Sequence, residues 1–234
     1  MTDLKDKVYL ITGGSSGLGK AMAASLKNEG AQVIITGRDQ SKMEAVANEL
    51  EVKSFHANVD KDHEIEKLYQ WIEKEYGRLD GLINNAGIGD WAALDEISRA
   101  KMKHVFETNV FGATMMASYA AKIFKKQNFG DLVNIASTAS LKGYKMGSIY
   151  AASKFALRGL SQCWQAELRP YNVRVIQINP SEVPTAFAKD DRVEKPLESN
   201  KLTPQEIADT LLATLKMDRR GFIPEVTVYA TNPF

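Results

Sequence analysis

The sequence predicts an α/β fold in which helices cover both faces of a doubly wound, mostly parallel sheet of seven strands. Short apolar runs rich in β-branched residues alternate along the chain with longer segments of helical periodicity. Nearly every apolar run ends in small or polar residues, which is typical of strands whose carboxyl ends carry a binding site. The 234 residues contain no linker, repeat or low-complexity segment, so we expect one domain over residues 1–234.

Composition excludes several functional classes. A net charge of +1 gives no electrostatic reason to expect a nucleic acid or an anionic membrane as partner. The single cysteine, Cys163, cannot form an internal disulfide, the N-terminus is too charged for a signal peptide, and no apolar run is long enough to span a bilayer. We therefore expect a cytoplasmic protein. The three histidines lack the spacing of metal ligands, so we expect no metal site.

The first predicted strand, residues 8–11, leads into a glycine-rich turn at residues 12–19, and a segment of helical spacing follows. Such a turn directs backbone N–H groups and a helix N-terminus at its ligand, and its glycines let a pyrophosphate approach closely. A lone turn of this kind is weak evidence against a plain turn, but its place between the first strand and the first helix favours a dinucleotide, as in a Rossmann fold. The candidate cofactor-binding residues here are Gly13, Ser15, Ser16, Gly17, Leu18 and Gly19.

The second predicted strand, residues 32–36, ends without a carboxylate and is followed by Gly37 and Arg38. At this point a Rossmann fold meets the adenosine ribose, where an acidic side chain would accept the 2′-hydroxyl and repel a 2′-phosphate. The planar guanidinium of Arg38 suits phosphate oxygens, so the sequence favours NADP over NAD. Asp39, the next residue, argues for the opposite preference.

Four further strands are expected at residues 53–57, 79–83, 131–135 and 173–178, and a last one at 225–230. Small or polar segments follow the first four of these five strands, at residues 58–60, 84–87, 136–140 and 179–181. A long helical stretch at about 98–126 is interrupted in pattern near 109–112. Residues 181–202 are polar and irregular, which is typical of a lid or substrate loop. A helix then begins at Pro204.

Tyr150 and Lys154 lie four residues apart at the start of a predicted helix that runs to about Arg169. At this spacing the two side chains share one helical face. A phenol alone is a poor proton donor to a carbonyl near neutral pH, because its pKa is about 10. We expect the neighbouring ammonium to lower that pKa. Taken alone, the pair could equally be one of many surface pairs.

Over nearly its whole length the chain resembles the short-chain dehydrogenases/reductases. The turn Thr12-Gly13-x-x-x-Gly17-x-Gly19, the segment Asn84-Asn85-Ala86-Gly87 and the interval of 13 residues between Ser137 and Tyr150 match that family. The resemblance implies an oxidoreductase with NADP(H) as cofactor that interconverts carbonyls and secondary alcohols. Its implied catalytic residues are Asn109, Ser137, Tyr150 and Lys154.

In the roles that the resemblance implies, Tyr150 is the general acid or base and Lys154 lowers its pKa and holds the nicotinamide ribose. Ser137 would hydrogen-bond the substrate oxygen, and Asn109 would anchor a water relay to Lys154. The physics agrees, since donors placed beside a developing alkoxide stabilise the transition state. Further implied cofactor contacts are Asn58, Val59, Asn85, Ala86, Gly87, Pro180, Val183 and Thr185.

Three departures from the family pattern affect these expectations. Asn58 replaces an aspartate, although its side-chain oxygen can still accept a hydrogen bond. Ser181 replaces a glycine, so we expect another loop conformation there, because positive φ would strain a serine. The C-terminus lacks a Gly-Gly ending, which weakens the assignment as a 3-oxoacyl-carrier-protein reductase without excluding it. A catalytically silent dinucleotide-binding regulator is the alternative from another functional class.

Two expectations concern surfaces. The face of the 98–126 stretch is more apolar than one packed stripe needs, with Phe111, Met115 and Tyr119 beyond that stripe, so we expect a homodimer or homotetramer. The competing interpretation is that these residues all pack on the sheet. The substrate, a small carbonyl or alcohol, is not identified by the sequence. We expect a partly aromatic substrate pocket from residues that could equally be core or interface packing: Trp91, Leu141, Tyr144, Met146 and Phe187.

Overall fold

The computed structural model describes residues 2–187, 196 and 198–233. Its centre is a seven-stranded sheet in the order β3-β2-β1-β4-β5-β6-β7, and every strand pair is parallel. The order reverses between β1 and β4, which creates a crevice at the carboxyl ends of the strands. The strands are β1 (Val8–Thr12), β2 (Gln32–Gly37), β3 (Lys53–His56), β4 (Gly81–Asn84), β5 (Gly130–Ile135), β6 (Val173–Pro180) and β7 (Glu225–Val228).

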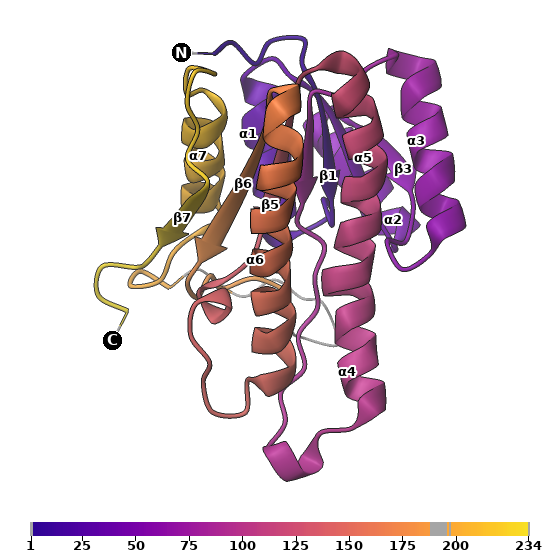
Figure 1. Cartoon of the computed structure of the whole chain (residues 1–234). Coiled ribbons are helices and arrows are strands. Elements are labelled where there is room, and N and C mark those ends of the chain that lie inside the picture. Colours follow the sequence, from indigo (N-terminus) through magenta and orange to yellow (C-terminus); the bar gives the residue numbers. More distant parts are fainter. Residues whose placement is uncertain (1, 188–195, 197, 234) are drawn as a thin grey trace.

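Helices cover both faces of this sheet, as predicted (Figure 1). Helices α1, α2 and α7 pack on one face, and α3, α5 and α6 pack on the other. The helices are α1 (Gly17–Asn28), α2 (Gln40–Leu50), α3 (Asp62–Tyr76), α4 (Arg99–Phe106), α5 (Ala113–Gln127), α6 (Ser148–Leu168) and α7 (Pro204–Leu215).

Burial explains why the central strands form where they do. The residues of β1, β4, β5 and β6 are all buried, which is expected of parallel strands covered on both faces. Alternate residues of β1 point into the two layers: Ile11 joins the core beneath α1 and α7, and Leu10 joins the core beneath α3 and α5. The two cores fix the strand register and hence the positions of the loops beyond the carboxyl ends.

The stretch predicted at 98–126 consists of α4 and α5 joined by a π-helical turn, Glu107–Gly112. The interruption expected near 109–112 is therefore confirmed, and its cause is a locally wider helical turn of a kind often found at functional sites. Other boundaries shift slightly. Strand β4 begins two residues later than expected, and β7 ends at Val228 rather than Ala230.

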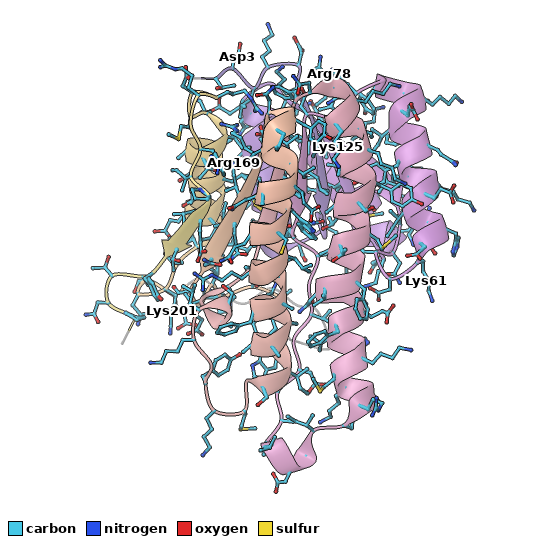
Figure 2. The ribbon with its side chains drawn as sticks, in the orientation of Figure 1. Asp3, Lys61, Arg78, Lys125, Arg169 and Lys201 are labelled. Atoms are coloured by element: carbon cyan, nitrogen blue, oxygen red, sulfur yellow. The ribbon has the colours of Figure 1, made fainter. Side chains whose placement is uncertain are left out.

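Charged side chains such as Asp3, Lys61, Arg78 and Lys125 are exposed on the outside of the molecule (Figure 2). Among the described residues, no helix combines the length and the apolar character needed to cross a bilayer. Since these charged side chains lie on the outside, the candidates for a functional site are the polar groups buried near the carboxyl ends of the strands.

Candidate active site

One cavity of about 920 Å³ lies at the carboxyl ends of the strands and brings the predicted motifs together. Its lining runs from the glycine-rich turn after β1, past the ends of β2 and β4, to Ser137, Tyr150 and Lys154. The segments that supply these residues are far apart in the sequence, and the parallel topology brings them to one edge. Of the predicted cofactor residues, these line the cavity: Gly13, Ser15, Ser16, Gly17, Leu18, Arg38, Val59, Asn85, Ala86, Gly87, Tyr150, Lys154, Pro180, Val183 and Thr185.

The glycine-rich turn has the backbone that a phosphate cradle needs. Gly13 and Gly17 both adopt positive φ, which L-residues with a side chain rarely do. A Cβ atom at Gly17 would lie 3.2 Å from Thr185, so a larger residue would narrow the cavity at this point. The turn leads directly into the N-terminus of α1, where the helix dipole favours an anion. These features fit the pyrophosphate of a dinucleotide.

Thr12 ties the glycine-rich turn to the loop after β4, a role that the sequence did not suggest. Its hydroxyl oxygen accepts hydrogen bonds from the backbone N–H groups of Asn85 (3.0 Å) and Ala86 (2.9 Å). The Asn85 amide donates in return to the carbonyl oxygens of Thr12 (2.9 Å) and Gly13 (3.1 Å). In the sequence this clamp is visible only as a threonine at the end of one predicted strand and an Asn-Ala pair after another.

The end of β2 presents two cations to the cavity, Arg38 and Lys42. Asp39, the residue that argued for NAD, also lines the cavity. It caps α2, because its carboxylate accepts hydrogen bonds from the Lys42 backbone N–H (3.0 Å) and the Ser41 hydroxyl (2.8 Å). The bond from Lys42 is the main reason that the pKa of Asp39 is lowered. Lys42 was not predicted as a cofactor residue, although its basic side chain stands only four positions after Arg38.

Gly19 and Asn58, also predicted as cofactor residues, are not among the residues that line the cavity. Gly19 lies beneath the turn, and a Cβ atom there would overlap the Gly13 carbonyl oxygen. Gly19 therefore contributes to the shape of the turn and not to the surface of the cavity. The Asn58 side-chain oxygen accepts a hydrogen bond from the Asp60 backbone N–H (3.1 Å), so it caps a local turn. Its neighbours Ala57 and Val59 line the cavity instead.

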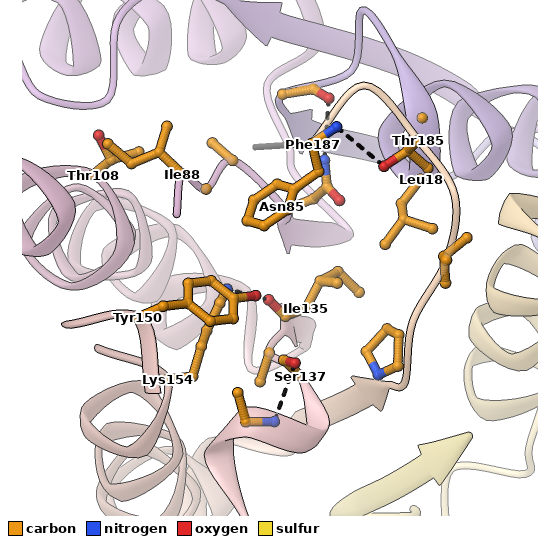
Figure 3. Close-up of a pocket in the computed structure, with 18 of the residues that line it drawn as sticks. Leu18, Asn85, Ile88, Thr108, Ile135, Ser137, Tyr150, Lys154, Thr185 and Phe187 are labelled. Atoms are coloured by element: carbon orange, nitrogen blue, oxygen red, sulfur yellow. Dashed lines mark hydrogen bonds between the residues drawn. The ribbon is translucent and has the colours of Figure 1, made fainter. Parts of the chain in front are cut away.

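Tyr150 and Lys154 extend from the first turns of α6, and Ser137 follows β5 (Figure 3). All three line the cavity. The Lys154 ammonium donates a hydrogen bond to the carbonyl oxygen of Ile135 (3.0 Å) and lies 5.7 Å from the centroid of the Tyr150 ring. The Ser137 hydroxyl oxygen accepts from the Ala139 N–H (3.1 Å), which holds it at the start of a short helical turn.

Burial changes the proton affinities of this pair. Burial raises the pKa of the Tyr150 phenol, and a hydrogen bond with Ser137 acts in the opposite direction. Burial also lowers the pKa of the Lys154 ammonium to about 8. Desolvation disfavours the phenolate and the ammonium alike, and it is the largest influence on both groups. The phenol therefore keeps its proton near neutral pH, and Lys154 titrates close to that range. The expected effect of Lys154 on the pKa of Tyr150 stays a prediction.

Asn109 is buried in the π-helical turn and does not line the cavity. Its amide donates to the carbonyl oxygen of Ile88 (2.9 Å) and to the Ser153 hydroxyl (3.0 Å), and its oxygen accepts from the Ile88 N–H (2.9 Å). Asn109 thus joins the loop after β4 to α6, one residue before Lys154. The water relay expected at Asn109 stays a prediction.

We expected Ser181 to avoid positive φ because it replaces a glycine, and the structure confirms this. Its backbone N–H donates to the carbonyl oxygen of Val228 (2.8 Å), which continues the pairing of β6 with β7. The segment beyond it brings Val183, Thr185 and Phe187 to the cavity. Residues 188–195 and 197 of the predicted substrate loop lie outside the described part of the chain.

Of the five residues proposed for a partly aromatic pocket, Trp91, Tyr144 and Phe187 line the cavity. Leu141 and Met146 are not among the lining residues. Tyr229, just beyond β7, also reaches the cavity and was missed, because the predicted strand extended through it. The site thus combines a phosphate cradle, two buried proton-carrying groups and an aromatic wall.

Comparison with known proteins gives a consistent result. A family model described as short chain dehydrogenase matches residues 7–196. An uncharacterised oxidoreductase of Staphylococcus aureus strain MRSA252 is 33% identical over 231 residues, covering 97% of this chain and 99% of that protein.

Two solved structures are also similar. An alcohol dehydrogenase from the archaeon Thermococcus sibiricus, in complex with 5-hydroxy-NADP, superposes with a TM-score of 0.89 at 28% identity and 97% coverage of both chains. A metagenomic short-chain oxidoreductase in complex with NADP has a TM-score of 0.85 at 28% identity, covering 98% of this chain and 99% of that one.

Proposed function

Because the chain belongs to the short chain dehydrogenase family, we propose that it is an NADP(H)-dependent oxidoreductase that interconverts a carbonyl compound and a secondary alcohol. The observation that carries the proposal is the meeting of Ser137, Tyr150 and Lys154 with the glycine-rich turn in one cavity. A phosphate cradle alone would suit many binding proteins, but a buried phenol and a buried ammonium beside it suit proton transfer.

A bound NADP(H) supplies hydride to the carbonyl carbon or accepts it from the alcohol. In the direction of reduction, the carbonyl oxygen gains negative charge as the hydride arrives. Ser137 and Tyr150 stabilise that charge by hydrogen bonding, and Tyr150 gives its proton to the oxygen. Lys154, whose pKa is about 8, then returns a proton towards Tyr150. Oxidation uses the same groups in reverse order.

Three observations support NADP over NAD. Arg38 and Lys42 line the cavity at the end of β2, where a 2′-phosphate would lie. Asp39 also lines the cavity, but its carboxylate accepts hydrogen bonds at the start of α2, and the two cations outnumber it. Two solved structures similar to this chain are complexes with NADP or a hydroxylated NADP.

The proposal extends to the organisation of the protein. We propose that residues 1–234 form one domain, that the chain acts in the cytoplasm, and that residues 181–202 form the substrate loop. Its described part supports the last point, because Thr185 lies near the glycine-rich turn and Phe187 lies near Tyr150.

The proposed function is tested by following NADPH absorbance with a panel of aldehydes and ketones. We expect turnover with at least one carbonyl compound, and formation of the matching alcohol in equal amount. Tight NADPH binding without turnover of any panel member, or of any secondary alcohol in reverse, would instead favour the silent regulator.

Reduction should depend on pH through Lys154. This ammonium is charged below about pH 8 and neutral above it. The loss of the proton removes the group that reprotonates Tyr150, so kcat/KM for reduction should fall as pH rises through about 8, and oxidation should become faster. In Lys154→Arg the charge persists to far higher pH, so the residual activity should show no fall near pH 8. A parent profile that stays flat from about pH 6 to pH 10 would contradict the role of Lys154.

We also propose a homodimer or homotetramer. Phe111 is 52% exposed in the turn between α4 and α5, and Phe155 is 43% exposed on α6. Met115 and Tyr119 are partly buried, with Tyr119 stacked on Tyr69, so they contribute less free surface than the sequence suggested. Light scattering at micromolar concentration should give a multiple of the 25.9 kDa chain mass. A mass of one chain, unchanged by NADPH, would rule out self-association.

A further inference from the structure

Two aromatic rings pack beside the catalytic phenol, and a third is hydrogen-bonded to one of them. We propose that the three form an aryl-binding wall that selects neutral substrates with an aromatic ring near the carbonyl. This aryl wall consists of Trp91, Tyr144 and Phe187. The inference rests on the proposed function and adds the substrate class.

The rings of the aryl wall come from three loops at the carboxyl ends of neighbouring strands. Trp91 follows β4, Tyr144 follows β5 and Phe187 follows β6. The Trp91 and Phe187 centroids lie 5.8 Å and 5.6 Å from that of Tyr150, and the two rings meet edge to face at 6.3 Å. Figure 3 shows the Phe187 ring next to that of Tyr150. Trp91 and Phe187 therefore pack beside the Tyr150 ring at the wall of the cavity.

Two glycines and three hydrogen bonds hold the wall in place. A Cβ atom at Gly89 would overlap the Trp91 indole, and one at Gly147 would lie 2.6 Å from the Tyr144 ring. The indole N–H of Trp91 donates to the Tyr144 hydroxyl (2.8 Å), and the Ala92 N–H donates to the Met146 carbonyl oxygen (3.1 Å). The third bond runs from the Phe187 N–H to the Thr185 hydroxyl (3.3 Å) and holds the backbone of Phe187 in place. The rings are thus placed before substrate binds.

Part of the aromatic surface of the wall is exposed in the cavity. Trp91 is 37% exposed and Tyr144 is 46% exposed, although both line the cavity. Large aromatic side chains left open in a cavity gain most from an aromatic ligand, because offset and edge-to-face ring contacts add to simple burial. The Trp91 N–H is already bonded to Tyr144, so the ring presents its carbon surface to the ligand.

The charges near the wall favour a neutral substrate. Apart from the catalytic Lys154 and the charges at the end of β2, the charged residues that line the cavity are Lys142 and Glu182. Glu182 is paired with Lys201 at 2.7 Å, and Lys142 is exposed to solvent. Neither charge is buried against the rings, so nothing in the wall offers a desolvated partner for a charged substituent.

The test compares phenylacetone with cyclohexylacetone, which carry the same isolated methyl ketone on rings of similar size. We expect kcat/KM with NADPH to be at least ~10-fold higher for phenylacetone, because each favourable ring contact contributes roughly 2–12-fold. Trp91→Leu and Phe187→Leu should each reduce this ratio by ~3-fold or more. Leu94→Ala, a control at an 83% exposed site beyond the wall, should leave the ratio unchanged.

A second measurement separates this inference from the proposed function. Calorimetry with NADP present should show phenylacetamide, which is not reduced, binding more tightly than cyclohexylacetamide, and Trp91→Leu should remove the difference. Selective amide binding without turnover of any ketone would overturn the proposed function and support the wall. Turnover with equal or better use of cyclohexylacetone would overturn the wall and leave the proposed function standing.

Discussion

Tyr150→Phe should reduce turnover by roughly 10²–10⁴-fold, the range expected when a general acid is removed. The substitution deletes only the phenol oxygen, and the ring keeps its place beside Trp91 and Phe187. NADPH affinity and melting temperature should therefore change little. The measurement is kcat with NADPH and a reducible ketone, accompanied by calorimetric NADPH binding to the same preparation.

Tyr171→Phe is the matched control for this variant. Tyr171 lies after α6, at the amino end of β6, where Lys125 packs over its ring. It is not among the cavity residues, so its loss of a phenol oxygen should leave kcat unchanged. If Tyr150→Phe kept turnover within a few-fold of the parent while Tyr171→Phe behaved the same way, Tyr150 would not be the proton donor.

Arg38→Asp should weaken NADPH binding by roughly 10²-fold, while NADH binding changes by only a few-fold. A charge-assisted hydrogen bond to phosphate contributes on the order of tenfold to a hundredfold, and the new carboxylate would also repel the 2′-phosphate. Lys42 remains beside the site, so part of the preference should survive and should be lost only in the double variant Arg38→Asp, Lys42→Ala.

The control for Arg38→Asp is Arg220→Asp, which changes the net charge equally. Arg220 is 92% exposed and bonded to Asp218, outside the cavity lining. Calorimetric dissociation constants for both cofactors should be unchanged by this control. A parent protein that binds NADH more tightly than NADPH would show that the interpretation of Arg38 is wrong.

The parallel fold could be predicted from the sequence because strand and helix periods alternate clearly, and the switch point then brings the motifs together. Tyr150 and Lys154 were predicted from their spacing at the start of a helix, and Ser137 from the resemblance to the short-chain dehydrogenases/reductases. Spacing along the chain cannot reveal how deeply a group is buried. The raised pKa of Tyr150 is an example, since its largest cause is burial, which the sequence does not show.

Other features depend on contacts between distant loops. The clamp from Thr12 to Asn85 joins two strands that are neighbours only after the crossover. Asp39 looked like a ribose ligand until its hydrogen bonds to α2 became visible. The packing of the Trp91 indole against Gly89 depends on a side-chain rotamer, which residue types alone do not specify.

The central claim is that this chain moves hydride between NADPH and a carbonyl carbon while Tyr150 supplies the proton. It is tested most directly by turnover of phenylacetone with NADPH deuterated at either face of nicotinamide C4, followed by mass spectrometry of the alcohol. We predict one deuterium at the carbinol carbon from one of the two deuterated cofactors, and almost no product from Tyr150→Phe. Consumption of both deuterated cofactors without deuterium in the alcohol would contradict the claim.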